Sequence, residues 1–132
     1  MLTILLVEDD EDDIEFTQWA LEKSSWKDYS LIIVRDGKAA VDLIFNRTGD
    51  NESTPDLVLL DINLPKLDGF AVLSKIRDKF DSEELPVFIF VGSELDIKYY
   101  NDRYQGTNDY IIKPLSTRTA EHIYKIISKG IN

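Results

Sequence analysis

Five short apolar runs recur along the chain, and longer stretches with helical spacing separate them. Each run has the length of a β-strand, and they cover residues 3–7, 31–34, 57–60, 87–91 and 110–112. Continuous apolar runs such as the one at 57–60 are typical of strands that helices bury on both faces. The alternation therefore predicts an α/β fold, doubly wound, with a five-stranded parallel sheet.

The stretches between the runs carry apolar residues three or four positions apart, as on one face of a helix. Trp19 falls off the stripe of its helix, so we expect it to be exposed. Residues 46–56 are polar and contain Gly49 and Pro55, which predicts a surface loop. The predicted core stripes of the five helices are Phe16, Thr17, Ala20 and Leu21; Ala40, Leu43 and Ile44; Val72, Leu73 and Ile76; Ile97, Tyr100 and Tyr104; and Ala120, Ile123 and Ile127.

Length and composition narrow the class of protein. The 132 residues are 43% hydrophobic and 30% charged, which fits a single domain over residues 1–132 without an output domain. The net charge of −10 argues against nucleic acid or an anionic membrane surface as a partner, because phosphates would be repelled. Because the chain has no cysteine and begins without a basic signal-peptide region, we expect a cytoplasmic location.

Charged residues directly follow three of the predicted strands. Glu8 and Asp9 follow the first strand, Asp61 follows the third, and Lys113 follows the fifth. Because ligands of open parallel sheets bind at the carboxyl ends of the strands, we expect these side chains to converge. Three clustered carboxylates repel one another unless a cation or a lysine offsets their charge, and oxygen ligands favour Mg²⁺, with Mn²⁺ as a substitute, over zinc. A carboxylate beside such a metal can attack phosphorus, and Asp61 is the best-placed nucleophile.

Each of these residues also has a simpler interpretation. The acids after the first strand could be solvated and favoured by a helix dipole, and we adopt that interpretation for residues 10–13. Asp61 alone could cap a helix, and Lys113 could precede an ordinary turn. Their combination at three strand ends favours a functional site. Pro114 fits a cis peptide bond that would turn the lysine back toward that site.

Three segments together resemble the response regulator receiver family of two-component signalling: Leu6-Val7-Glu8-Asp9, the stretch from Leu60 to Gly69, and Tyr110-Ile111-Ile112-Lys113-Pro114. The resemblance covers essentially the whole chain and implies the flavodoxin-like strand order 2-1-3-4-5. It implies that Asp61 takes a phosphoryl group from a sensor histidine kinase and that Lys113 pairs with a phosphoryl oxygen. It also implies metal binding by Asp9, Asp61, the backbone carbonyl of Asn63 and, mainly through water, Glu8.

The chain departs from the family at the end of the fourth strand. Family members usually carry Thr or Ser there, and its hydroxyl bonds the phosphoryl group. This chain has Val91, which cannot donate that bond, followed by the customary small residue, Gly92. Ser93 would reach the site only if its loop bends inward, and Tyr110 matches the family's aromatic switch position. We therefore expect a weakened or rerouted switch.

The resemblance also implies partners. The loop at 46–56 is similar to that of stand-alone receivers that serve bacterial phytochrome-type kinases. Tyrosines crowd the fourth and fifth predicted helices and indicate a face for a downstream protein or a homodimer. His122 flanks a packing stripe, which favours a structural role over a phosphorelay one. The tyrosines are Tyr99, Tyr100, Tyr104 and Tyr124.

Other functions fit parts of the pattern. A haloacid-dehalogenase-type phosphatase would need an acid two residues after Asp61, where this chain has Asn63. A flavodoxin would need a hydroxyl-rich phosphate loop where this chain has acids. The stronger alternative is a degenerate receiver that works as a phosphorylation-independent interaction module, which Val91 and the exposed tyrosines favour. The intact acidic set and lysine argue against it, so we expect a signalling phosphoacceptor and not an enzyme.

Overall fold

The computed structural model describes residues 2–45 and 54–129. In it, parallel strands form one sheet in the order β2-β1-β3-β4-β5. Every strand contains its predicted apolar run and extends it by two residues at most, so the predicted sheet and strand order are confirmed. The strands are β1 Leu2–Val7, β2 Tyr29–Val34, β3 Leu57–Asp61, β4 Val87–Val91 and β5 Asp109–Ile112.

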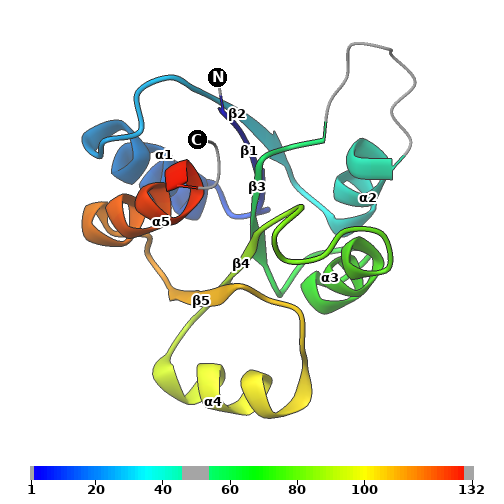
Figure 1. Cartoon of the computed structure of the whole chain (residues 1–132). Helices are drawn as coiled ribbons and strands as arrows, with labels where there is room; N and C mark the ends of the chain where they lie inside the picture. The colour runs from blue at the N-terminus through cyan, green and yellow to red at the C-terminus, as the bar shows by residue number, and fades with distance from the viewer. Residues whose placement is uncertain (1, 46–53, 130–132) are drawn as a thin grey trace.

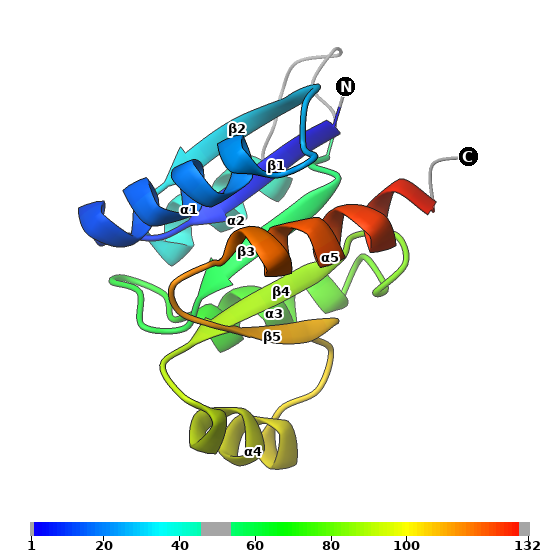
Figure 2. The same ribbon diagram turned by 90° about the vertical axis from the view of Figure 1, so that its left-hand side faces the viewer.

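Helices connect the strands and cover both faces of the sheet. Figure 1 shows α1 and α5 on one face and α2 and α3 on the other, with α4 beside the β5 edge, and the turned view in Figure 2 agrees. This is the predicted doubly wound arrangement. Part of the predicted surface loop, residues 46–53, lies outside the described residues. The helices are α1 Glu11–Lys23, α2 Gly37–Phe45, α3 Gly69–Arg77, α4 Glu94–Arg103 and α5 Thr117–Lys129.

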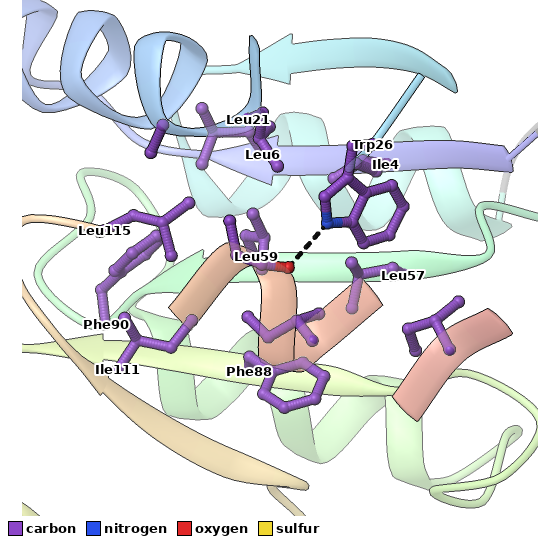
Figure 3. Close-up of a cluster of buried hydrophobic side chains, with 14 of the residues drawn as sticks. Ile4, Leu6, Leu21, Trp26, Leu57, Leu59, Phe88, Phe90, Ile111 and Leu115 are labelled. Carbon is purple, nitrogen blue, oxygen red and sulfur yellow. Dashed lines mark hydrogen bonds between the residues drawn. The ribbon is translucent and has the colours of Figure 1, made fainter. Parts of the chain in front are cut away.

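Each face of the sheet has its own hydrophobic core. Strands β3 and β4 are buried along their whole length, which explains their uninterrupted apolar sequences. Figure 3 shows the core under α1 and α5, where Trp26 Nε1–H donates a hydrogen bond of 2.8 Å to the carbonyl of Ala120. The sequence assigned no role to Trp26. In the structure its hydrogen bond joins the loop between α1 and β2 to α5.

The predicted core stripes hold on most helices. Ala40 and Ile44 of α2 are buried, as are all the predicted residues of α3 and α5, whereas Leu43 is only half-buried. On α4 no residue is fully buried, and Ile97 and Tyr100 are half-buried. The predicted stripe is wrong at Tyr104, which is exposed because α4 ends at Arg103 and Tyr104 is its C-cap. This helix is therefore the least embedded element among the described residues.

On α1 the predicted stripe is wrong at one position. Phe16 is 52% exposed, because Ile14 occupies the buried face together with Thr17 and Leu21. Phe16 lies roughly 100° around the helix from the centre of that face. Trp19 is 60% exposed, as predicted. No helix within the described ranges is both long and apolar enough to cross a membrane.

Polar side chains close the amino end of the sheet. Asp56 Oδ2 accepts a hydrogen bond of 2.8 Å from the backbone N–H of Thr3. Asn108 Oδ1 accepts one from the backbone N–H of Val87 at 2.8 Å and another from Arg77 at 3.0 Å. These side chains replace backbone partners that the strand ends lack. Arg77 donates further hydrogen bonds to the carbonyls of Phe80, Asp81, Leu85 and Gly106.

Candidate functional site

The predicted acidic residues meet at the carboxyl end of the sheet. Strands β1 and β3 are neighbours, with Val7 paired to Leu60, so the next residues, Glu8 and Asp61, extend from adjacent strand ends. One carboxylate oxygen from each of Glu8, Asp9 and Asp61 lies within 4.8 Å of the other two. The parallel topology therefore brings these residues together as the sequence predicts.

Lys113, which follows β5, reaches across the sheet to this cluster. Its Nζ lies 2.8 Å from Glu8 Oε1 and 3.4 Å from Asp61 Oδ2. The Lys113–Pro114 peptide bond is cis, the form expected from the sequence. The ammonium group is thus in place beside the proposed nucleophile.

Asp13 also contacts this lysine, and the sequence interpretation missed it. Its Oδ2 accepts a hydrogen bond of 2.8 Å from Lys113 Nζ, although residues 10–13 were expected to be solvated acids. Asp9 lies before Asp10, the N-cap of α1, so no helical spacing in the sequence linked Asp13 to the acids at the strand ends. Asp10, by contrast, has a local role, because it caps α1 by accepting from the Asp13 backbone N–H at 3.0 Å.

Burial sets the protonation of the site. Glu8 is 1% exposed and Asp61 6% exposed, whereas Asp9 is open to solvent. Burial raises the pKa of Glu8 to about 7, against the lowering effect of its hydrogen bond from Lys113, and the charge of Asp61 raises it further. Burial would lower the pKa of Lys113, but hydrogen bonds to Asp13 and Glu8 outweigh it and leave that pKa above its ordinary value. The lysine therefore remains an ammonium.

A tight turn after β3 holds Asp61 at the edge of the sheet. The Gly69 N–H donates to the carbonyl of Ile62 at 3.0 Å, and a Cβ on Gly69 would collide with the carbonyl oxygen of Asp61. Asp68 then caps α3 by accepting from the Ala71 N–H at 2.9 Å. Only glycine lets the helix begin this close to the strand end. Asn63 lies exposed in this turn.

The donor set suits a hard divalent cation. Its atoms are carboxylate oxygens, which Mg²⁺ and Mn²⁺ prefer. Three carboxylates around one ammonium leave surplus negative charge, and a divalent ion would balance it. The residues present therefore fit the predicted metal.

The predicted switch residues lie at the end of β4 and on β5. Val91 is buried and apolar, and Gly92 N–H donates to Asp96 Oδ2 at 3.2 Å. Ser93 caps α4, where its hydroxyl accepts from the Asp96 N–H at 3.3 Å. The Tyr110 hydroxyl is buried without a hydrogen-bond partner among the described residues, and burial raises its pKa. Ser93 carries the one hydroxyl of residues 91–93, and its hydrogen bond within the described structure is to the cap of α4 and not to the acidic site.

The predicted four-tyrosine face is wrong in one member. Tyr100 of α4 and Tyr104, the C-cap of that helix, pack on Phe70, with the Tyr104 ring stacked at 3.8 Å between centroids. Tyr124 instead packs edge to face on Trp26 at 5.1 Å and adjoins the core under α1 and α5. It lies four residues after Ala120, on the buried side of its helix. The exposed large apolar side chains of α4, its C-cap and β5 are Leu95, Tyr99, Tyr104 and Ile112.

Comparisons with known proteins agree with this geometry. The family model described as the response regulator receiver domain matches residues 4–125. Response regulator Rcp1 from Synechocystis sp. is 36% identical over 126 residues, which are 94% of this chain and 82% of Rcp1.

Solved structures give the same result. The bacteriophytochrome response regulator RtBRR matches with a TM-score of 0.80 and 34% identity over 100% of this chain and 79% of that chain. The Mn(2+)-bound form of Rcp1 matches with a TM-score of 0.73 and 34% identity, covering 95% and 93% of the two chains. The phosphorylated cyanobacterial phytochrome response regulator RcpA matches with a TM-score of 0.70 and 36% identity, covering 97% and 91%.

Proposed function

Because this chain belongs to the response regulator receiver family, we propose that Asp61 is its phosphoryl acceptor and a sensor histidine kinase its donor. One observation carries the proposal: Asp61 ends a buried strand within a cluster of three carboxylates, and Lys113 Nζ lies 3.4 Å from its Oδ2. The chain is a signalling protein, and its chemistry is the gain and loss of this phosphoryl group.

The transfer is a nucleophilic displacement at phosphorus. A carboxylate oxygen of Asp61 forms the new P–O bond while the P–N bond of a phosphohistidine breaks. The imidazole nitrogen leaves with the electron pair of that bond and takes up a proton. The Lys113 ammonium stands where it can pair with an oxygen of the transferred group.

We further propose that Asp9, Asp61, the backbone carbonyl of Asn63 and, mainly through water, Glu8 hold Mg²⁺ or Mn²⁺. When bound, such an ion neutralises negative charge on the phosphoryl oxygens. The all-oxygen donor set and its surplus negative charge support this proposal. The Mn(2+)-bound form of the relative Rcp1 supports it as well.

The partners are proposed from the relatives and from the surface. RtBRR and RcpA are phytochrome response regulators by name, so we propose a phytochrome-type histidine kinase as the donor. The α4–β5 face exposes Leu95, at 80%, together with Tyr99 and Ile112. An apolar face of this kind suits a downstream protein or a second copy of this chain.

A second candidate function is a phosphorylation-independent interaction module. The buried Val91 favours it, because the strand end where family members present a hydroxyl is apolar here. The Ser93 hydroxyl next to it is engaged in the cap of α4. Under this alternative, partner binding would be equally strong with and without a phosphodonor.

Intact-protein mass separates the two functions. The protein is incubated with acetyl phosphate and Mg²⁺, and in parallel with excess chelator. The acceptor proposal predicts a gain of one phosphoryl group with the metal and none with the chelator. A folded protein that gains no mass in either condition would favour the interaction module.

A further inference from the structure

The contacts of Lys113 are divided among three carboxylates. Its Nζ lies 2.8 Å from both Asp13 Oδ2 and Glu8 Oε1, and 3.4 Å from Asp61 Oδ2. An ammonium has three N–H donors. Two of them are occupied by Asp13 and Glu8, so the third is left for Asp61 and for whatever Asp61 carries.

Asp13 and Glu8 differ in the other interactions open to their carboxylates. Glu8 belongs to the group of carboxylates that fits a metal, and Asp13 does not. A divalent ion held there would attract Glu8 and would compete with its bond to Lys113. Asp13 is therefore the carboxylate that can hold Lys113 whether or not a metal is bound. Its side chain is only 26% exposed and that of Lys113 only 23%, so solvent screens the pair incompletely.

The direction of Asp13 is set by a well-anchored element. Its backbone N–H is bound by the side chain of Asp10 at 3.0 Å, which caps α1. The next residue, Ile14, is buried in the core under α1, and Thr17 is buried one turn later. The first turn of α1 is thus fixed from both sides, and it presents Asp13 to Lys113.

We propose that Asp13 is a positioning residue for Lys113: it holds the ammonium so that one N–H points to Asp61 and meets the incoming phosphoryl oxygens. This inference rests on the proposed function and deepens it. Asparagine at position 13 keeps the size of the side chain but removes its charge, so the lysine would sample other directions. Phosphorylation would slow even though acceptor, metal ligands and lysine all remain.

The main test compares Asp13→Asn with Asp12→Asn. Asp12 is exposed in the same helical turn, so its replacement makes the same change in net charge. The rate of phosphorylation by acetyl phosphate is measured at saturating Mg²⁺. We expect Asp13→Asn to slow it about five- to tenfold, with Asp12→Asn within about twofold of wild type. Equal rates in the two variants would overturn the inference.

A double-mutant comparison asks whether Asp13 acts through the lysine. In a Lys113→Met background, adding Asp13→Asn should change the remaining rate by less than about twofold. The same slowing in both backgrounds would show that Asp13 acts by another route, and would overturn the inference.

A third readout needs neither metal nor phosphodonor. Solvent exchange of the Lys113 ammonium protons, followed by NMR in chelator, should be several-fold faster in Asp13→Asn than in Asp12→Asn, because the hydrogen bond to residue 13 is weaker without the carboxylate charge. Equal exchange would contradict the positioning role. A wild-type protein that never labels would overturn the proposed function and this inference together, whereas labelling in wild type with an unaffected Asp13→Asn overturns the inference alone.

Discussion

The two ends of the parallel sheet use charged side chains in opposite ways. At the amino end, Arg77 donates to four backbone carbonyls and to Asn108, and Asp56 accepts from a backbone N–H. At the carboxyl end, Glu8 and Asp61 are buried beside Asp9 and compete for one lysine. Charges at the first end satisfy the backbone, whereas those at the second repel one another. Such repulsion costs stability. Clusters of like charge are therefore typical of sites where a bound ligand offsets the charge.

The two ends of the sheet should differ most when one carboxylate at each end of β3 is neutralised. Asp61→Asn should abolish labelling by acetyl phosphate, a loss of more than about 100-fold, because the nucleophile is gone. Asp56→Asn, just before the same strand, should label at the wild-type rate and lose only about 1 kcal/mol of stability. Intact mass and urea unfolding measure the two effects. An Asp61→Asn protein that labels like wild type would sink the site assignment.

The burial of Glu8 at the carboxyl end of the sheet should make the stability of the protein depend on pH. Burial raises the pKa of Glu8 from 4.5 to about 7, so the folded chain holds this proton more tightly than the unfolded chain. The free energy of unfolding should therefore fall as pH rises between these two values and level off above about 7, by about 3 kcal/mol in all. Urea unfolding in chelator across this range measures it.

Two variants isolate the Glu8 contribution. Glu8→Gln should flatten this part of the pH profile, because its amide does not titrate. Glu15→Gln, on the exposed side of α1, should keep the wild-type slope. A wild-type profile that matches that of Glu8→Gln would mean that Glu8 titrates in the folded chain as it does in the unfolded one.

The amino end should respond in stability alone. Arg77→Met removes five hydrogen bonds and leaves loop carbonyls without partners, so we expect a loss of about 2 kcal/mol. Arg77→Lys should recover little of it, because an ammonium cannot span the same acceptors. Lys75→Met, exposed on the same helix, should stay within about 0.5 kcal/mol of wild type. Labelling of the folded variants should match wild type. A loss of labelling in folded Arg77→Met would contradict a role for Arg77 in stability alone.

The smallest expected effect tests the apolar end of β4. Val91→Thr buries a hydroxyl and should cost about 1 kcal/mol in the unphosphorylated protein. Acetyl phosphate with Mg²⁺ should then raise the melting temperature of Val91→Thr more than that of wild type, because the phosphoryl group offers the hydroxyl a partner. Val87→Thr, buried at the other end of the same strand, should lose stability without that recovery. If phosphorylation raised the melting temperature equally in Val91→Thr and Val87→Thr, the missing hydroxyl at position 91 would not be what limits the switch.

The fold and the centre of the site were predictable because topology constrains both. Strands buried on both faces leave continuous apolar runs, as in β3 and β4. In a parallel sheet all carboxyl ends meet at one edge, so Asp61 and Lys113 converge although 51 residues separate them along the chain. Strand-end position was therefore sufficient to predict that these two side chains meet.

Residues whose roles depend on side-chain direction or on loops were harder to predict. Arg77 binds mainly backbone carbonyls, which carry no residue-specific signal in a sequence. Asp13 stood among consecutive acids, and nothing in its neighbours marked it as the one facing Lys113. Phe16 was assigned to the wrong side because a short apolar stripe admits neighbouring helical phases. Tyr124 was grouped with the tyrosines near α4 by residue type, although it lies four residues after the buried Ala120.

The most direct measurement locates the phosphoryl group. Protein labelled with acetyl phosphate and Mg²⁺ is reduced with borohydride, which converts an aspartyl phosphate to homoserine, and its peptides are sequenced by mass spectrometry. We expect homoserine at position 61 in labelled wild-type protein and none in protein kept in chelator. Homoserine at position 9 or at any other aspartate, with position 61 unchanged, would contradict this expectation.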